Sequence, residues 1–278
     1  MNEIVLAQSA IALRPGREEN SRPARRRLNL WGWLLPATLL AVLEAVVAVG
    51  WVPARLMPAP TDIIDTLNEL ARQGLALHIL VSTARVLAGF AIGAALGIVV
   101  GAAVGLSRRT ESILDPTFQA LRAIPGLAWV PLLLLWLGID ELPKITLIAI
   151  GAFFPVYLGL VSGIRDVDRK QVEVGEMYGL KGAELIRRIF IPAALPSLFT
   201  GLRTSLSLAW MFLVAAELIA ATKGLGYLLT DGREVSRPDI VVAAILLLAI
   251  LGKLSDTALK AIETRKLRWR DAFAPKNG

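Results

Sequence analysis

Six long runs of apolar residues divide this sequence of 278 residues. They lie at 31–52, 84–106, 117–139, 145–164, 197–221 and 240–262. In a helix, about 20 apolar residues reach across the hydrocarbon core of a bilayer, where a spanning segment must satisfy its own backbone hydrogen bonds. Hydrophobic residues make up 55% of the chain, more than one soluble core of this size needs. The sequence therefore predicts an all-α polytopic membrane protein with six transmembrane helices.

Basic residues gather in alternate connections between these runs. The tail at 1–29, the loop with Arg108 and Arg109, the segment 165–196 and the C-terminus are rich in Lys and Arg, and all four lie on one side of a six-span protein. Because cytoplasmic loops carry such an excess, we expect both termini in the cytoplasm, a basic cytoplasmic tail at 1–29 and a transmembrane domain at 30–278. The net charge of +7 therefore indicates contact with a lipid bilayer rather than with nucleic acid.

The connection between the first two runs contains an amphipathic stretch, "TDIIDTLNELARQG". Its apolar residues recur at helical spacing, and Thr61 stands at the expected N-cap. We expect a short helix on the outer surface of the membrane here.

The second run carries a glycine at every fourth position. These residues are Gly89, Gly93, Gly97, Gly101 and Gly105. They share one helix face and let a neighbouring backbone come close, which is a common packing device in membranes. Ordinary tolerance of glycine in membrane helices is the alternative, but the strict spacing favours a packed interface. The second span is therefore expected in the middle of the bundle.

The segment 165–196 is charged, although apolar runs precede and follow it. We expect two short amphipathic helices joined at Gly179, with Pro192 ending the second helix and Pro196 beginning the next span. A segment of this kind is either a connector that rests on its own bundle or a docking element for a soluble partner.

The spacing within this segment resembles the EAA loop of permease subunits in bacterial ATP-binding-cassette (ABC) importers. That loop reads E-A-A, three residues, G, nine residues, I, one residue, L-P. The matching residues are Glu173, Val174, Gly175, Gly179, Ile189, Ile191 and Pro192, with three departures from the pattern at Val174, Gly175 and Ile191. We call 165–196 the EAA segment. From Trp51 onward, stretches such as "AELIAATKGLGYLL" resemble permeases for aliphatic sulfonate, taurine and nitrate, and "LLAILGKLSDTALKAIETRKLRW" is most similar to the sulfonate members.

This resemblance implies a type I importer permease (MetI-like) fold in the bacterial inner membrane. Two copies would form the path for a small organic anion, an aliphatic sulfonate in the first place, with taurine, nitrate or another small solute as alternatives. Two ATPase subunits would bind the EAA segments, and an extracytoplasmic binding protein would deliver the substrate. The chain has no phosphate-binding G-x-x-x-x-G-K-[ST] motif, so it is expected to hold no cofactor itself, ATP and Mg being bound by the ATPase.

Three charged residues within the runs are candidates for the translocation path: Glu217, Arg122 and Arg203. Charges at membrane depth are costly and are functional candidates by default. Glu217 could instead make a structural hydrogen bond within the bundle, and the two arginines could extend to lipid phosphate. With one histidine and no cysteine, the sequence predicts neither a metal site nor catalytic residues. A transport subunit is thus favoured over a membrane enzyme, and a self-sufficient secondary transporter is a remote alternative.

Overall fold

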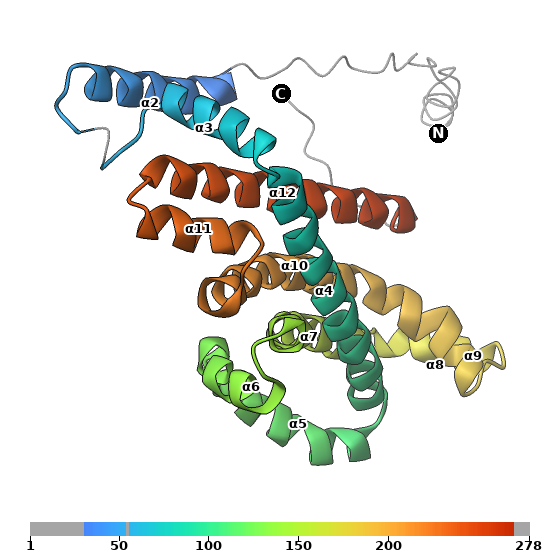
Figure 1. The fold of residues 1–278 in the computed structure, drawn as a ribbon. Helices are drawn as coiled ribbons and strands as arrows, with labels where there is room; N and C mark the ends of the chain where they lie inside the picture. Colours follow the sequence, from blue (N-terminus) through green and yellow to red (C-terminus); the bar gives the residue numbers. More distant parts are fainter. Residues whose placement is uncertain (1–30, 54–55, 270–278) are drawn as a thin grey trace, which may run out of the picture. The chain divides into compact units, whose positions relative to one another are not determined.

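The computed structural model describes residues 31–53 and 56–269 (Figure 1). The chain divides into two units, Met1–Val42 and Leu43–Gly278. The expected tail at 1–29 lies outside the described residues. In the first unit the described residues belong to α2 (Trp31–Ala48), which ends in the second unit. The first span was expected to reach residue 52, but the helix ends at Ala48 and Gly50 follows with a left-handed φ of 80°.

The second unit is helical, and no strand occurs within residues 43–53 and 56–269. The helices after α2 are α3 (Pro60–Arg72), α4 (Leu75–Leu106), α5 (Arg108–Ala123), α6 (Trp129–Leu137), α7 (Glu141–Arg165), α8 (Arg169–Met177), α9 (Ala183–Leu185), α10 (Ile191–Ala220), α11 (Leu225–Glu234) and α12 (Pro238–Lys266). A 3₁₀ turn (Gly126–Ala128) precedes α6, and a π-helical turn (Ile186–Phe190) joins α9 to α10. The all-α prediction is confirmed.

Within residues 31–53 and 56–269, four helices are long and apolar enough to cross a membrane by themselves: α4, α7, the continuous helix Ala183–Ile219 and α12. The pair α5 and α6 makes a fifth if it counts as one span. The second predicted span begins nine residues late, because α4 starts at Leu75 rather than at residue 84.

The third predicted span, 117–139, is wrong as a single helix. The chain bends by 85° between α5 and the 3₁₀ turn that leads into α6. Ile124 is extended there, with φ −74° and ψ 124°, because the residue before a proline is disfavoured in the helical region and Pro125 follows. The ring of Phe212 lies against Gly126 on the far side of the break, in space that a Cβ would fill.

The second unit is built on close contact between α4 and α7, which run in the same direction. A Cβ on Gly89 would meet Ile148, one on Gly97 would lie 2.9 Å from the carbonyl oxygen of Phe153, and one on Gly105 would meet Ile164. All five glycines of the stripe face α7 in this way. The helix with most buried residues is α7 rather than α4, so the glycine helix packs against the centre of the unit instead of forming it.

Helix α10 packs antiparallel against the other side of α7. Gly201 approaches the carbonyl of Pro155 and the Cα of Gly159, and Ser205 donates a 2.7 Å hydrogen bond to the carbonyl of Ala152. Helix α12 then packs antiparallel to α10, where the Trp210 indole donates to Ser255 at 2.9 Å. The unit therefore has two ends. At the Arg85 end, α4 and α7 begin and α10 ends; at the EAA end, α4 and α7 end and α10 begins.

The prediction that Pro192 ends a helix is wrong. The helix that starts at Ala183 continues through the π turn into α10, and Pro192 lies in the first turn of α10. The π turn accommodates the proline: Ile191 N–H donates to the carbonyl of Ile186, five residues earlier, so the hydrogen-bond pattern is already shifted just before Pro192, which has no N–H to donate.

Candidate functional site

A cavity of about 610 Å³ lies between the α5–α6 pair, α7 and α10. Its walls carry aromatic side chains from three elements: Trp129, Phe154 and Phe212. Hydroxyl groups of Ser162, Ser197, Thr200 and Thr204 lie on the α7 and α10 sides. Small-molecule sites typically have volumes of roughly 300–1,000 Å³, largely apolar walls and few polar groups, and this cavity has that character.

Arg122 is the one charged residue among the described residues that line this cavity. It belongs to the last turn of α5, directly before the bend. Thr200 and Thr204 each donate their hydroxyl proton to the carbonyl four residues earlier, at 3.1 Å. Their oxygens can therefore accept hydrogen bonds from a guest while the protons stay engaged, which leaves Arg122 as the strongest donor to an anion.

The other two path candidates do not line the cavity. Arg203 Nε donates to Asp256 at 2.9 Å, and its Nη1 lies 3.6 Å from Glu263, so it joins α10 to α12. Glu217 is only 1% exposed and belongs to a polar cluster at the Arg85 end. Thus the structure places one of the three predicted charges at the cavity and the other two in helix–helix contacts.

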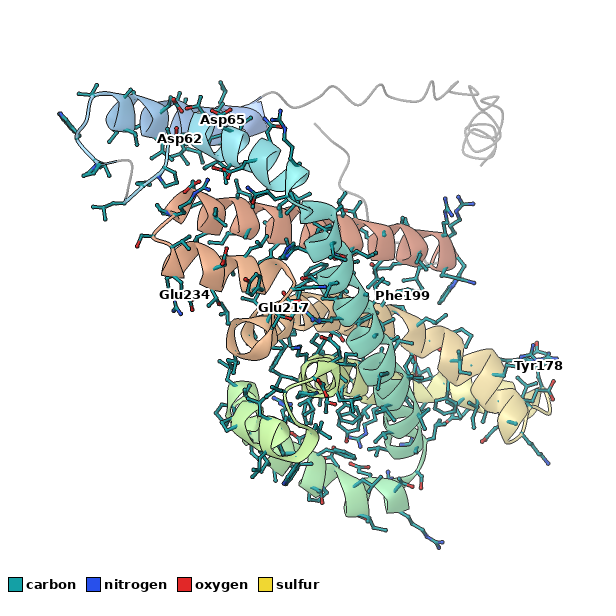
Figure 2. The ribbon with its side chains drawn as sticks, in the orientation of Figure 1. Asp62, Asp65, Tyr178, Phe199, Glu217 and Glu234 are labelled. Carbon is teal, nitrogen blue, oxygen red and sulfur yellow. The ribbon has the colours of Figure 1, made fainter. Side chains whose placement is uncertain are left out.

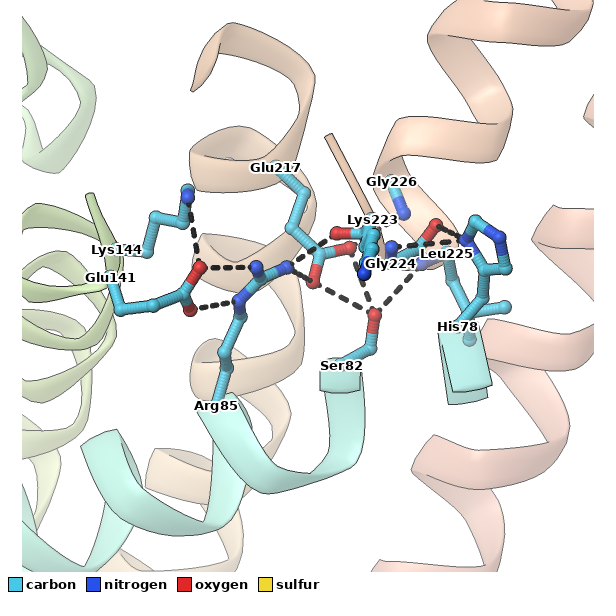
Figure 3. A network of polar contacts seen from close by, with 10 residues as sticks. All are labelled: His78, Ser82, Arg85, Glu141, Lys144, Glu217, Lys223, Gly224, Leu225 and Gly226. Carbon is cyan, nitrogen blue, oxygen red and sulfur yellow. Dashed lines mark hydrogen bonds and ion pairs between the residues drawn. The ribbon is translucent and has the colours of Figure 1, made fainter. Parts of the chain in front are cut away.

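The polar cluster around Arg85 consists of Ser82, Arg85, Glu141, Lys144, Glu217 and the backbone of 223–226 (Figure 3). Arg85 lies on α4, is 5% exposed, and binds both oxygens of Glu141 on α7 at 2.6 Å through Nε and Nη2. Its Nη1 donates to Glu217 Oε1 and to the Lys223 carbonyl, each at 2.7 Å. Lys144 also donates to Glu141, at 3.1 Å. Two cations and two carboxylates therefore balance in one cluster.

Glu217 also completes the start of α11. Gly226 N–H donates to Glu217 Oε2 at 2.7 Å, and Leu225 N–H donates to the Ser82 hydroxyl at 2.8 Å. The first N–H groups of a helix have no partner within it, and the helix dipole favours a negative charge at this end. Gly224, with φ 128°, provides no side chain for the task, so α4 and α10 provide the cap.

Sequence reasoning missed Arg85 and Glu141. Arg85 lies in the second predicted run, where the rule that singled out Glu217 applies to it equally: a charge among apolar residues calls for a partner. The charge of Arg85 is opposite to that of Glu217, and this was a usable signal that the two residues pair. Glu141 carried no such signal, because an acidic residue in a short polar connection is ordinary.

The EAA segment forms a compact two-helix projection at the opposite end. Gly175 on α8 is buried against Leu185 and Ile189, so α8 packs on the helix that continues into α10. The chain reverses at Gly179, whose φ of 82° is a conformation that side chains with a Cβ rarely adopt. Among the other matching positions, Glu173, Val174 and Ile191 are exposed, and Pro192 is half-buried.

Large side chains are exposed at the tip of this projection. Met177 is 86% and Tyr178 is 84% exposed, and Val174 adds to the same helix. Figure 2 shows Tyr178 at the tip, far along the unit from Glu217. Exposed large side chains of this kind are typical of a surface that binds another protein.

This chain is similar to one protein family and to several known proteins. Residues 93–268 match the family described as "Binding-protein-dependent transport system inner membrane component". The chain is 42% identical over 254 residues to a Bacillus subtilis (strain 168) protein named as an aliphatic sulfonates transport permease, SsuC, covering 91% of this chain and 92% of that protein. It is 43% identical over 247 residues to the SsuC of Escherichia coli (strain K12), covering 88% and 94%.

The name of a third relative gives a different substrate. The taurine transport system permease protein TauC of Escherichia coli (strain K12) is 34% identical over 266 residues, covering 90% of this chain and 96% of that protein. The family match covers more than half of the chain, and these relatives are named as transport permeases, not as enzymes. The chain therefore belongs to the binding-protein-dependent transport system inner membrane components, and it is the multi-pass permease subunit of an ABC importer that works with an ATPase and a substrate-binding protein.

Proposed function

We propose that two copies of this chain form the path by which an aliphatic sulfonate crosses the inner membrane. The observation that supports this substrate is the similarity to two proteins named as aliphatic sulfonate permeases, at 42% and 43% identity, against 34% for the taurine permease. The cavity agrees in character, because Arg122 suits a sulfonate group and the aromatic walls suit an alkyl chain.

Taurine and nitrate remain the alternatives. Taurine carries an ammonium group besides its sulfonate, and no carboxylate occurs among the described residues that line the cavity. Nitrate has no apolar part for the walls around Phe154 and Phe212. An alkanesulfonate therefore fits the chemistry of the lining better than either.

The proposed topology has six spans with both termini in the cytoplasm. It counts α2 as the first span and the bent pair α5–α6 as the third, and it puts the EAA end at the cytoplasmic face. The concentration of Lys and Arg in alternate connections supports this orientation.

In the proposed mechanism, each ATPase subunit grips one EAA segment, with Glu173, Gly179, Ile189 and Pro192 among the coupling positions. ATP and Mg bind to the ATPase. Closure of the two ATPases draws the segments together, and the helices continuous with them move as rigid bodies to change access. The unbroken helix from Ala183 to Ile219 supports such a transfer, because it joins the projection directly to the cavity wall.

Uptake of a radiolabelled alkanesulfonate into proteoliposomes that contain the permease, ATPase and binding protein tests the proposal. If excess taurine or nitrate competes more strongly with this uptake than other alkanesulfonates do, the assignment of an alkanesulfonate as the substrate is contradicted.

The Arg122→Met variant should lower uptake at least tenfold without loss of the ATPase from the complex. Uptake by the permease alone, with no ATPase present, would favour a secondary transporter.

Gly179→Asp and Glu173→Lys test the coupling role separately. Both variants should insert in the membrane and bring down less ATPase during purification than the unaltered chain. Glu234→Lys is the matched charge reversal, on an exposed position of α11 at the other end. A normal ATPase complex from both EAA variants would contradict the docking role.

A further inference from the structure

The Arg85 cluster joins four helices that lie far apart in the sequence. Arg85 and Ser82 belong to α4, Glu141 to α7, Glu217 to α10, and Gly226 to α11. Contacts run from Arg85 to α7, α10 and the chain before α11, while Ser82 reaches both α10 and α11. This set of contacts plays no part in the cavity or in the EAA segment.

The hydrogen bonds of the cluster fix the positions of its side chains. Four of the five N–H donors of Arg85 are engaged, and the planar guanidinium makes a two-bond fork with Glu141. Both oxygens of Glu217 accept hydrogen bonds, and Ser82 and Glu217 are almost fully buried. A looser arrangement would leave a buried charge uncompensated, which costs more than the pair itself contributes.

We propose that Arg85 is a positioning residue that fastens α11 and the end of α10 to α4 and α7, so that these four helix ends move as one rigid body. Arg85 is central because it is the residue of the cluster that binds Glu141 and Glu217 together. Without it, the buried carboxylate of Glu217 loses its cationic partner, the cap of α11 loses its support, and α7 loses its only described polar link to α10 at this end.

The remainder of α7 and α10 can carry motion between the two ends. At Gly159 and Gly201 the two backbones are in direct contact, so the helices have little freedom to slide. A rotation of α7 and α10 imposed at the EAA end would then reach the Arg85 end, and the four helix ends there would stay joined. Only this transport consequence rests on the proposed function; the rigid grouping of the helix ends does not.

Distance measurements between spin labels test the rigid grouping without any substrate. The chain contains no cysteine, so labels can be attached at Leu142→Cys on α7 and Glu234→Cys on α11, both exposed positions. In the purified importer, Arg85→Met should at least double the width of this distance distribution. Arg85→Lys, which keeps the charge but not the fork, should give an intermediate width. Arg237→Met removes a cation outside the cluster and should leave the distribution unchanged.

A second variant keeps the test decisive if Arg85→Met fails to fold. Glu141→Gln breaks the fork to α7 but leaves Arg85 and Glu217 paired. It should broaden the α7–α11 distance and leave the α4–α11 distance, from Leu77→Cys to Glu234→Cys, unchanged. Equal broadening of both distances, or of neither, would overturn the proposal.

Transport provides the last readout. Arg85→Met should reduce alkanesulfonate uptake about tenfold while the ATPase still co-purifies and retains its basal activity. If the unaltered importer takes up no alkanesulfonate, the proposed substrate fails, but the distance result still decides the role of Arg85. An unchanged distribution in Arg85→Met with normal uptake would exclude the positioning role.

Discussion

The carboxylate of Glu217 caps a helix to which it does not belong: Gly226 N–H, in the first turn of α11, donates to Glu217 Oε2 at 2.7 Å. Gly226 also allows the approach, since a Cβ there would collide with the Cβ of Glu217. Helix α11 therefore starts where it does because α10 brings a negative charge to that point.

Gly226→Ala should destabilise the permease, because the new Cβ displaces Glu217 from the α11 cap. Overpacking of this kind typically costs about 1–3 kcal/mol. Thermal denaturation of the purified protein in detergent measures the loss. Gly252→Ala is the matched control, since the nearest atom to its new Cβ, in the ring of Trp210, would be 3.9 Å away. Equal stability of the two variants would contradict the role of Gly226.

Gly97→Ala should separate α4 from α7. The added Cβ would lie 2.9 Å from the Phe153 carbonyl oxygen and 3.0 Å from the Val156 Cβ, and neither the backbone nor a Cβ can swing aside. We expect a loss of about 1–3 kcal/mol, read from the yield of folded protein and its melting temperature. Ala91→Leu, on an exposed face of the same helix, should have little effect although it adds more atoms.

A fall in pH should weaken the contact between α3 and the start of α12. Arg237 Nη2 donates to Glu69 at 2.8 Å, and this hydrogen bond holds the pKa of Glu69 below its ordinary value. A carboxylate with a lowered folded pKa contributes stability above its unfolded pKa and loses that contribution as the pH falls through the folded pKa. Because both side chains are well exposed, the effect should be modest.

Hydrogen-exchange protection factors of the α3 amides, compared between neutral and acidic pH, measure this change. The Glu69→Gln variant should show low protection at both pH values, since it lacks the charge throughout. Asp65→Asn, on the exposed face of the same helix, should keep the pH dependence. A pH dependence that survives in Glu69→Gln would assign it to another group.

Tyr178→Ala should weaken binding of the ATPase. Exposed aromatic side chains often dominate protein–protein binding, and truncation of one at the centre of an interface costs about 2 kcal/mol or more, roughly thirtyfold in affinity. Titration of the ATPase against permease in nanodiscs measures this loss. Val235→Ala truncates an exposed apolar residue after α11 and should leave the affinity unchanged. Equal affinity for both variants would place the docking surface elsewhere.

Much of the fold follows from patterns along the chain. The apolar runs predicted an all-α membrane protein, and the spacing from Glu173 to Pro192 indicated the permease family, which the comparisons confirm. The glycines of α4 marked a packed face because a repeat of four residues returns to the same side of a helix. Periodicity and spacing are local properties, so a single sequence carries them in full.

The tertiary structure decided what those local signals could not. Pro125 disfavours helical backbone at Ile124, but the sequence did not indicate that the ring of Phe212 lies beside Gly126 at the 85° bend. Glu217 was compatible with a place in the translocation path or with a structural hydrogen bond, and its surroundings include Arg85, which lies 132 positions away. Partners at such separations are brought together only when helices pack, because the energy of a buried charge depends on neighbours that its own stretch of sequence does not contain.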